Sequence, residues 1–206
     1  NFLENSKIKF LPDAILNIKE FQLQKNISKN LLFDKKIILT AGRLTKQKNH
    51  EYLIRELKDF LIKNTEYNLI ILGEGEERQN LERIIKKLNL SKSIILKGFK
   101  ENPFSYMVKS DVFILSSKWE EVGFVIVEAA LSNLLVISSN CPNGPTEFLK
   151  NGNAGLLYEN NKKDSLKNLL YRINDNNLIR KISAKKNSLK YTRFRHYLIF
   201  KKLLNL

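Results

Sequence analysis

Two glutamates lie at either side of the start of an apolar segment in the middle of the chain. Glu120 and Glu128 have seven residues between them, and the stretch Gly123-Phe124-Val125 lies within that interval. A carboxylate inside an apolar run is costly to bury unless hydrogen bonds compensate it. Glu128 therefore either has a partner within the protein or binds a ligand that is rich in hydroxyl groups.

The apolar segment 124–132 is expected to form a buried helix, because a strand-like run follows it. Free backbone N–H groups at its start would make an anion site, to which the helix dipole contributes roughly 0.3–1 kcal/mol. Phosphate at the helix start and hydroxyl groups at Glu120 and Glu128 would match the shape of a sugar nucleotide. The alternative is that Glu128 caps a neighbouring loop and Glu120 is solvated like Glu121. Spacing alone slightly favours that alternative.

A basic loop forms a second group of candidate residues. Arg43, Lys46 and Lys48 follow directly after the strand-like run 36–42. Cations at the end of a strand, beside the start of a helix, suit an anionic ligand. An ordinary surface lysine is the better interpretation of Lys46. For Arg43, which directly follows the strand, the ligand and surface interpretations are evenly balanced.

Short apolar runs alternate with helical patterns along the chain. Strands are expected at 36–42, 67–73, 92–98, 111–117, 134–139 and 154–158. Helices are expected at 49–64, with Asn49 as N-cap, at 76–88, with acidic residues in the first turn, and at 102–110, 124–132, 145–152, 164–174, 176–190 and near the end. The alternation predicts an α/β fold, a Rossmann-like parallel sheet with helices on both faces. Ligands of such sheets bind beyond the carboxyl ends of the strands, where both candidate groups fall.

Several other classes of site are not supported by the sequence. The stretch 72–78 resembles a dinucleotide fingerprint, but Arg78 takes the place of its third glycine and three glutamates would repel a pyrophosphate. His50 and His196 lack the spacing of metal ligands, and no Asp-x-Asp pair could hold a metal on a diphosphate. We therefore expect no metal and no cofactor besides a substrate.

Composition narrows the class of protein. The chain has 206 residues, of which 43% are hydrophobic, enough to form one domain with a core. Its net charge of +15 could serve nucleic-acid binding. Lys, Asn and Ile are frequent throughout, however, and no basic motif with flanking aromatics occurs, so we expect no nucleic-acid partner. The single cysteine, Cys141, allows no intrachain disulfide and is expected to be a buried thiol.

Targeting signals are not recognisable in the sequence. No apolar run approaches about 18 residues, the length that a membrane-spanning helix needs. The start lacks the apolar core of a secretory signal, and the only methionine is Met107. We expect a cytoplasmic protein, and we expect this sequence to be a fragment whose N-terminal part is missing.

Five segments, taken together and in this order, resemble one known family. They are TAGRLTKQKNHEYLI, LIILGEGEERQNLERIIKKLNL, IILKGFKENPFSYMVKSDVFILSS, EEVGFVIVEAA and NCPNGPTEFLKNGNAGLLY, which together span about residues 36–160. The chain resembles the C-terminal, donor-binding domain of the group 1 or family 4 retaining glycosyltransferases of the GT-B fold. Each motif alone is weak, and their order makes the resemblance specific.

The resemblance implies roles at the donor diphosphate. Arg43 and Lys48 would neutralise its charge. The backbone amides of Gly123, Phe124 and Val125 would bind the same phosphates. Stabilising a departing nucleoside diphosphate with preorganised donors, and without a metal, is electrostatic catalysis.

The resemblance also implies contacts to the rest of the donor. Glu128 would accept hydrogen bonds from the ribose, and Glu120 would be the catalytic residue that touches hydroxyls of the donor sugar. The loop at Phe99 and Lys100 would lie near the base. Where the family usually has Glu-Gly-Phe-Gly, this chain has Glu-Glu-Val-Gly at 120–123, so the second glycine of the pattern is kept.

The resemblance further implies an organisation in three parts. Residues 1–35 would be the connector from a missing N-terminal acceptor domain, residues 36–175 the domain that binds the nucleotide sugar, and residues 176–206 basic C-terminal helices. The expected function is transfer of a sugar from a nucleotide-diphosphate sugar to a glycan or lipid-linked acceptor, with retention, in cell-surface polysaccharide or lipopolysaccharide synthesis. The alternative is a non-catalytic nucleotide-sugar-binding subunit, or a truncated remnant, that needs a separate acceptor-domain chain.

The end of the chain suggests a second kind of partner. Residues 176–206 contain no Asp or Glu, and the stretch 190–204 mixes Arg and Lys with aromatic residues, as an interfacial helix does. Peripheral contact with the inner face of a membrane and packing against the missing domain are weighed equally.

Overall fold

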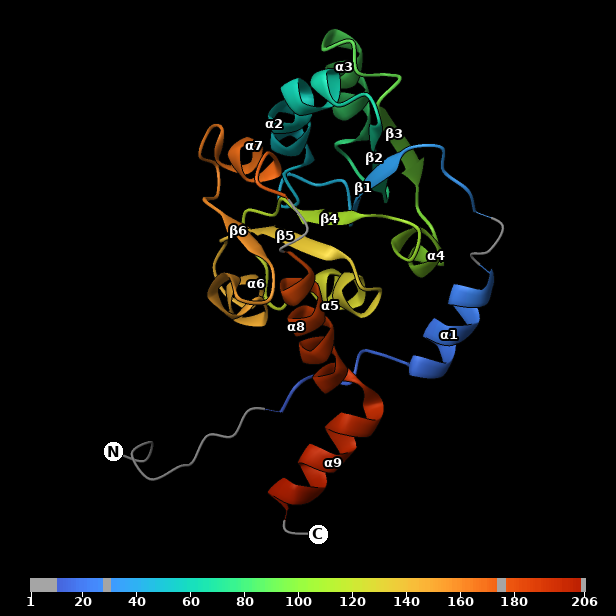
Figure 1. The fold of residues 1–206 in the computed structure, drawn as a ribbon, viewed down its shortest axis with the longest axis vertical. Coiled ribbons are helices and arrows are strands. Elements are labelled where there is room, and N and C mark those ends of the chain that lie inside the picture. Colours follow the sequence, from blue (N-terminus) through green and yellow to red (C-terminus); the bar gives the residue numbers. More distant parts are fainter. Residues whose placement is uncertain (1–10, 28–30, 174–176, 205–206) are drawn as a thin grey trace.

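The computed structural model describes residues 11–27, 31–173 and 177–204 of the chain. At its centre is a six-stranded parallel sheet with the strand order β3-β2-β1-β4-β5-β6 (Figure 1). The strands are β1 Lys36–Ala41, β2 Tyr67–Leu72, β3 Ile94–Gly98, β4 Val112–Leu115, β5 Leu135–Ser139 and β6 Leu156–Tyr158. This is the strand order of the Rossmann fold, and it confirms the predicted fold class.

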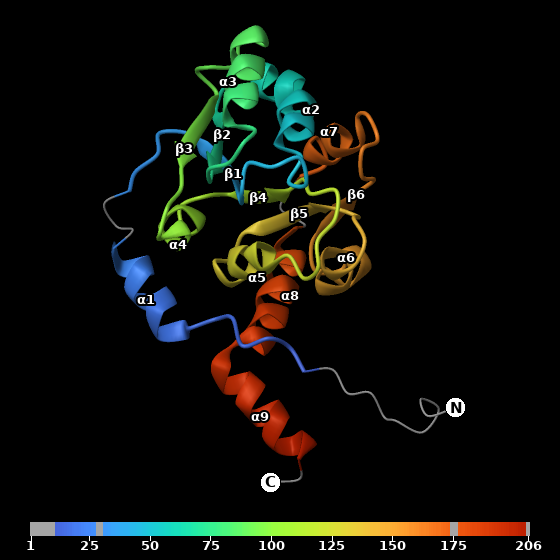
Figure 2. The same cartoon turned by 180° about the vertical axis from the view of Figure 1, so that it is seen from behind.

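Helices cover both faces of the sheet (Figures 1 and 2). One face is covered by α2 His50–Lys63, α3 Arg78–Lys87 and α7 Ser165–Leu170. The other face is covered by α4 Pro103–Met107, α5 Phe124–Leu131, α6 Gly144–Phe148 and α8 Leu178–Ser188. The remaining helical elements are α1 Ile18–Ile27, the 3-10 turns η2 Lys150–Gly152 and η4 Leu189–Tyr191, and α9 Arg193–Leu203.

The buried apolar residues form two clusters, one on each face. Successive side chains of β1 alternate between them: Ile37 and Leu39 lie in the cluster with α5 and α8, and Ile38 lies in the cluster with α2 and α3. This alternation follows from the two-residue period of a strand. Because both faces are covered, the strands are continuous apolar runs rather than alternating ones.

Of two local predictions about helix starts, one was confirmed in position only and the other was wrong. Asn49 does stand at the N-cap position of α2, but its backbone is left-handed at φ 54° and its side chain makes no capping bond. The side-chain amide of Asn49, through Nδ2, donates instead to Asn161 Oδ1 at 3.0 Å. The helix after β2 begins only at Arg78, so Glu76 and Glu77 precede its first turn rather than fill it.

A segment of the first 35 residues packs against the C-terminal part of the chain. Leu16 is buried in the core, its N–H donates to Tyr191 O, and its carbonyl accepts from the Arg193 N–H. Close by, His196 Nδ1 lies 2.7 Å from Pro12 O. Helix α1 was not predicted, because its polar and apolar residues show little helical periodicity.

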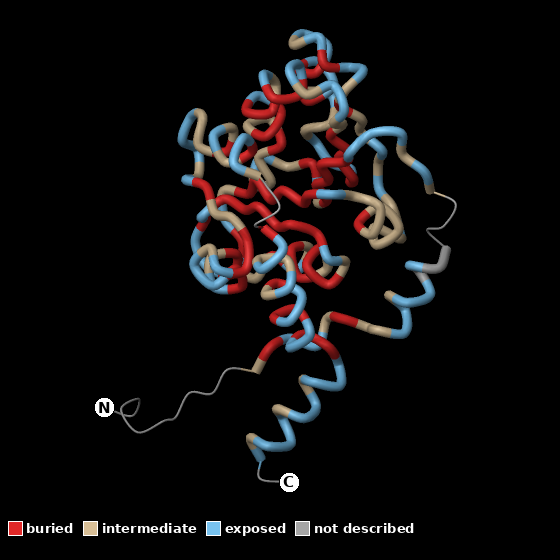
Figure 3. Tube along the Cα trace, in the orientation of Figure 1, coloured by how far each residue is buried: buried red, intermediate tan, exposed pale blue. Residues whose placement is uncertain are grey.

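Helix α9 extends away from the body of the protein (Figures 1 and 3). None of its residues is buried. Within the described ranges, no helix is both long enough and apolar enough to cross a membrane.

The strand order brings two distant loops together. The order reverses between β1 and β4, which are neighbours in the sheet although about 70 residues separate them in the chain. The loops that follow these two strands therefore share one edge. In open parallel sheets, ligands bind at this reversal point, beyond the carboxyl ends of the strands.

Candidate functional site

A cavity of about 930 Å³ lies at the carboxyl edge of the sheet, where the strand order reverses. Its walls come from the loops after β1, β2, β3 and β4 and from the start of α5. Eight of the nine residues that the sequence nominates line it: Arg43, Lys48, Phe99, Lys100, Glu120, Gly123, Phe124 and Val125. Small-molecule and cofactor sites in proteins typically have volumes of about 300–1,000 Å³.

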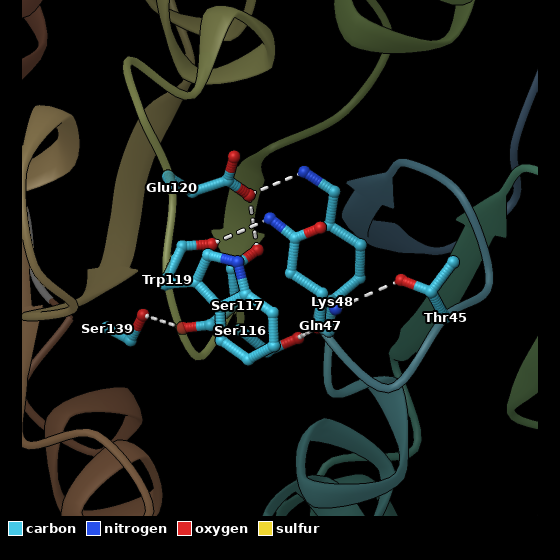
Figure 4. A network of polar contacts seen from close by, with 8 residues as sticks. All are labelled: Thr45, Gln47, Lys48, Ser116, Ser117, Trp119, Glu120 and Ser139. Atoms are coloured by element: carbon cyan, nitrogen blue, oxygen red, sulfur yellow. Dashed lines mark hydrogen bonds and ion pairs between the residues drawn. The ribbon is translucent and has the colours of Figure 1, made fainter.

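Glu120 is held by two donors on one carboxylate oxygen (Figure 4). Lys48 Nζ and Ser117 Oγ each lie 2.5 Å from Glu120 Oε1. Glu120 is 7% exposed, so this pairing supplies the partners that a buried carboxylate needs. The alternative that Glu120 is solvated like Glu121 is wrong, because only Glu121 is exposed.

The two loops are also joined through their backbones. The Lys118 N–H donates to Gln47 O at 2.8 Å, and Ser116 Oγ donates to Lys48 O at 2.7 Å. Gln47 Nε2 in turn donates to Trp119 O at 3.0 Å. Figure 4 shows the contacts of Ser116 with Lys48 and of Gln47 with Trp119 beside the Lys48–Glu120 pair. These bonds fix the two loops relative to each other.

Arg43 differs from Lys48 in having no partner. Its side chain is exposed at the cavity, and in the part of the chain that the structure describes no hydrogen bond or ion pair engages its guanidinium. A guanidinium has five N–H donors and suits phosphate oxygens bidentately. Arg43 is thus available to an anion in the cavity, and Lys48 must share its charge with Glu120.

The start of α5 faces the same cavity. Gly123 has a left-handed backbone, φ 70° and ψ 54°, and the first turn of the helix follows it. The amides of Gly123, Phe124 and Val125 form no hydrogen bond among the described residues, as expected at a helix start. Unpaired N–H groups and the positive end of a helix dipole are the features that suit an anion.

Glu128 is the one nominated residue that does not line the cavity. It lies one helical turn after Phe124, which does line the cavity, and on the same side of α5. Burial raises the pKa of Glu128 to about 7. No described residue bonds its carboxylate, so the expectation that Glu128 caps a neighbouring loop is wrong.

The other candidates for chemistry prove to be buried side chains. His50 lies in the core beneath the basic loop, where burial and the nearby Lys48 lower its pKa to about 4. Cys141 is buried as predicted, and burial raises the pKa of its thiol. Over the described ranges, no three His, Cys, Asp or Glu side chains are grouped as metal ligands.

Sequence reasoning missed several residues at the cavity. Gln47 and Trp119 belong to the two predicted loops, but nothing in their types indicated that they bond to each other. Glu74, which pairs with Arg78 at 2.7 Å, lines the cavity, but from the sequence it counted only among the three glutamates that argue against a dinucleotide site. Asp13 lines the cavity from the N-terminal segment, and no motif of the sequence places it there.

Gly73 keeps the loop after β2 close to the loop after β1. A Cβ at this position would lie 1.9 Å from Gly42 O, and the backbone φ is +135°. We expect Gly73→Ala to lower the free energy of unfolding by on the order of 3 kcal/mol, through a clash with backbone and a strained conformation. Urea denaturation would measure it. Gly152→Ala is the matched control, because φ there is +93° but no atom lies within 4 Å of the added Cβ. Equal losses of stability in the two variants would contradict a clash between residue 73 and the backbone of Gly42.

A family described as glycosyl transferases group 1 matches residues 23–190 of the chain. An uncharacterized glycosyltransferase of Methanocaldococcus jannaschii is 37% identical over 149 residues, which are 70% of this chain and 36% of that protein. The N-acetylgalactosamine-N,N'-diacetylbacillosaminyl-diphospho-undecaprenol 4-alpha-N-acetylgalactosaminyltransferase of Campylobacter jejuni is 36% identical over 131 residues, 64% of this chain and 35% of that protein.

A solved structure shares the fold. The Anabaena protein HepE in complex with UDP aligns with a TM-score of 0.72 and 21% identity, over 93% of this chain and 54% of that one. The chain spans about a third to a half of the length of the curated relatives that it matches. The likeness in fold extends over almost all of this chain and about half of the solved one.

Proposed function

The chain belongs to the group 1 glycosyltransferases, and from this membership we propose that its cavity binds the nucleotide-diphosphate sugar from which a sugar is transferred. The observation that carries the proposal is the combination of groups at one cavity. Arg43, Lys48 and the first turn of α5 suit a diphosphate, and Glu120 beside them suits a sugar hydroxyl.

The donor would lie across the reversal point of the sheet. Its diphosphate would bind Arg43, Lys48 and the amides of residues 123–125. Its sugar would meet Glu120, which touches the reacting substrate and is the residue we propose as catalytic. Its ribose would lie along α5 beyond the first turn, where its hydroxyls would donate to Glu128 and give that carboxylate the partners that it lacks. Phe99 and Lys100 line another part of the cavity, and the base of the nucleotide would bind against them.

The proposed reaction is sugar transfer with retention at the anomeric carbon. The bond from that carbon to the diphosphate breaks, and its electron pair goes to the phosphate oxygen. A new bond forms to an acceptor hydroxyl on the same face of the sugar, and the hydroxyl proton goes to the departing diphosphate. The cations and amides that bind the diphosphate in the ground state become more effective as negative charge grows on it.

The acceptor would be a glycan or a lipid-linked sugar, in cell-surface polysaccharide or lipopolysaccharide synthesis. This rests on the lipid-linked substrate that the name of the Campylobacter relative states. The acceptor site is assigned to a further domain or partner chain, corresponding to the part of the relatives that this chain does not span. Residues 36–175 would then be the donor half, joined to the rest through residues 1–35 and 176–206.

We also propose that α9 contacts an anionic membrane surface. Its exposed side chains include Phe194, Tyr197 and Phe200, and its last turn carries Lys201 and Lys202. We expect the protein to sediment with vesicles that contain anionic lipid and not with neutral vesicles. The double variant Lys201→Glu/Lys202→Glu should lose that sedimentation.

The vesicle experiment has a matched control in α3. Lys86 and Lys87 are exposed lysines in the last turn of that helix, so Lys86→Glu/Lys87→Glu changes the same charge in the same helical position. The control should bind vesicles as the unchanged protein does. Equal binding by both double variants, or none by the unchanged protein, would contradict the membrane contact.

Calorimetric titration with UDP, GDP and their common sugar conjugates tests the proposed function. We expect one nucleotide series to bind, and we expect Arg43→Ala and Glu128→Ala to weaken that binding. Binding of none of these nucleotides by the unchanged protein would overturn the proposal.

A further inference from the structure

Ser117 is a buried hydroxyl that contacts the proposed catalytic carboxylate. It is the second residue after β4 and is 0% exposed. Its Oγ donates to Glu120 Oε1 at 2.5 Å, and Lys48 Nζ donates to the same oxygen. No described residue bonds the other oxygen, Oε2, and Figure 4 shows it pointing away from both donors. One oxygen of Glu120 is therefore held and the other is free.

We propose that Ser117 is a positioning residue, which holds Oε1 of Glu120 so that Oε2 is presented to a hydroxyl of the donor sugar. The proposal rests on the proposed function for the identity of the ligand. A carboxylate that must accept a hydrogen bond from a sugar gains from being fixed before the sugar arrives. The hydroxyl of Ser117 is fully buried and donates to Glu120, so it would act through that carboxylate rather than by touching the sugar.

Lys48 and Ser117 differ in how many N–H or O–H groups they could still offer to a bound nucleotide sugar. An ammonium has three N–H donors, so Lys48 can turn part of its charge to the diphosphate. A hydroxyl has one donor, and that of Ser117 is already given to Glu120. Ser117 is thus the contact that keeps Glu120 in place when Lys48 also serves the diphosphate.

A second serine fixes Ser117 itself. Ser139, in β5, donates its Oγ to Ser117 O at 2.6 Å and is 0% exposed. The contact links the ends of two neighbouring strands through side chain and backbone (Figure 4). Buried polar contacts of this kind are strong when every member is satisfied. Ser117 is therefore anchored to strand β5, and Glu120 is anchored to the sheet through Ser117.

The test compares Ser117→Ala with Ser138→Ala. Ser138 is equally buried on β5, and its Oγ donates to Ser139 O at 2.9 Å without touching Glu120. In calorimetry we expect Ser117→Ala to bind UDP-glucose and UDP-N-acetylglucosamine, whichever the unchanged protein prefers, about tenfold more weakly. Its affinity for UDP alone should stay within twofold. Ser138→Ala should change neither affinity. Equal losses for UDP and the sugar conjugate, or no loss at all, would overturn the proposal.

A second measurement needs no nucleotide. In crystal structures of the ligand-free variants, we expect the Glu120 carboxylate to turn away from its present orientation in Ser117→Ala and to keep it in Ser138→Ala. An unmoved carboxylate in Ser117→Ala would overturn the positioning role. If the unchanged protein binds no nucleotide, the proposed function fails, and the position of this carboxylate still decides whether Ser117 orients it.

Discussion

Glu128→Gln is expected to stabilise the protein by about 2–3 kcal/mol at pH 8 and to leave its stability unchanged at pH 4. Burial raises the pKa of Glu128 from 4.5 to about 7 in the folded protein. Between these two pH values the folded state binds more protons than the unfolded state, so stability falls as pH rises through this window. Glutamine is neutral at every pH and removes that fall.

Urea denaturation between pH 4 and pH 8 measures the effect. The control is Glu66→Gln, at an exposed carboxylate that precedes β2, and it should leave the pH profile unchanged. A profile for Glu128→Gln that runs parallel to that of the unchanged protein would contradict a buried, unpaired carboxylate.

The same substitution should weaken binding of a nucleotide sugar by about 10–100-fold, since a hydrogen bond to a charged group contributes about 1.5–3 kcal/mol. A carboxylate can accept from two ribose hydroxyls when ionised, so affinity of the unchanged protein should rise as pH increases through about 7. Glu128→Gln should lose this rise. A residue that reduces stability while the site is empty is expected where function requires it.

Arg43→Ala is expected to weaken binding of a nucleoside diphosphate by about 100-fold, the loss of two charge-assisted hydrogen bonds. The structure gives this guanidinium no other partner, so its removal breaks no hydrogen bond or ion pair within the described part of the protein. The unfolding free energy should therefore change by less than about 0.5 kcal/mol. Calorimetry and urea denaturation, taken together, separate the two effects.

Lys46→Ala is the matched control for Arg43. Both side chains are exposed cations in the loop after β1, but Lys46 does not line the large cavity. Arg43→Lys should lie between the unchanged protein and Arg43→Ala, because an ammonium is a point charge without the fork of a guanidinium. Equal losses in Lys46→Ala and Arg43→Ala would indicate general electrostatics rather than a specific contact.

The fold was predictable from the sequence because each level of the pattern agrees with the others. Apolar runs of strand length alternate with helical patterns, and a parallel sheet buried on both faces has this signature. The Asn102–Pro103 helix entry also formed as expected, with Asn102 Oδ1 accepting from the Ser105 N–H. Element ends were less predictable; the helix expected over 102–110 spans only Pro103–Met107.

The contacts within the site depend on strand order, which the pattern does not reveal. Lys48 and Glu120 are 72 residues apart, and they meet only because β1 and β4 are neighbours. Asp13 reaches the cavity because Leu16 packs against the chain around Tyr191, a tertiary contact without a local signal. The raised pKa of Glu128 likewise depends on burial, which spacing alone left undecided.

Nuclear magnetic resonance of the ¹⁵N-labelled protein during titration with UDP tests the central claim most directly. If the nucleotide binds where we propose, the amides of Arg43, Gly123 and Phe124 should shift with one common affinity. Asn80 and Leu81 line a second, smaller cavity, which also includes residues of the loop after β1. Their amide signals should not shift. Shifts confined to that second cavity, or no shifts at saturating UDP, would contradict a donor site at the reversal point of the sheet.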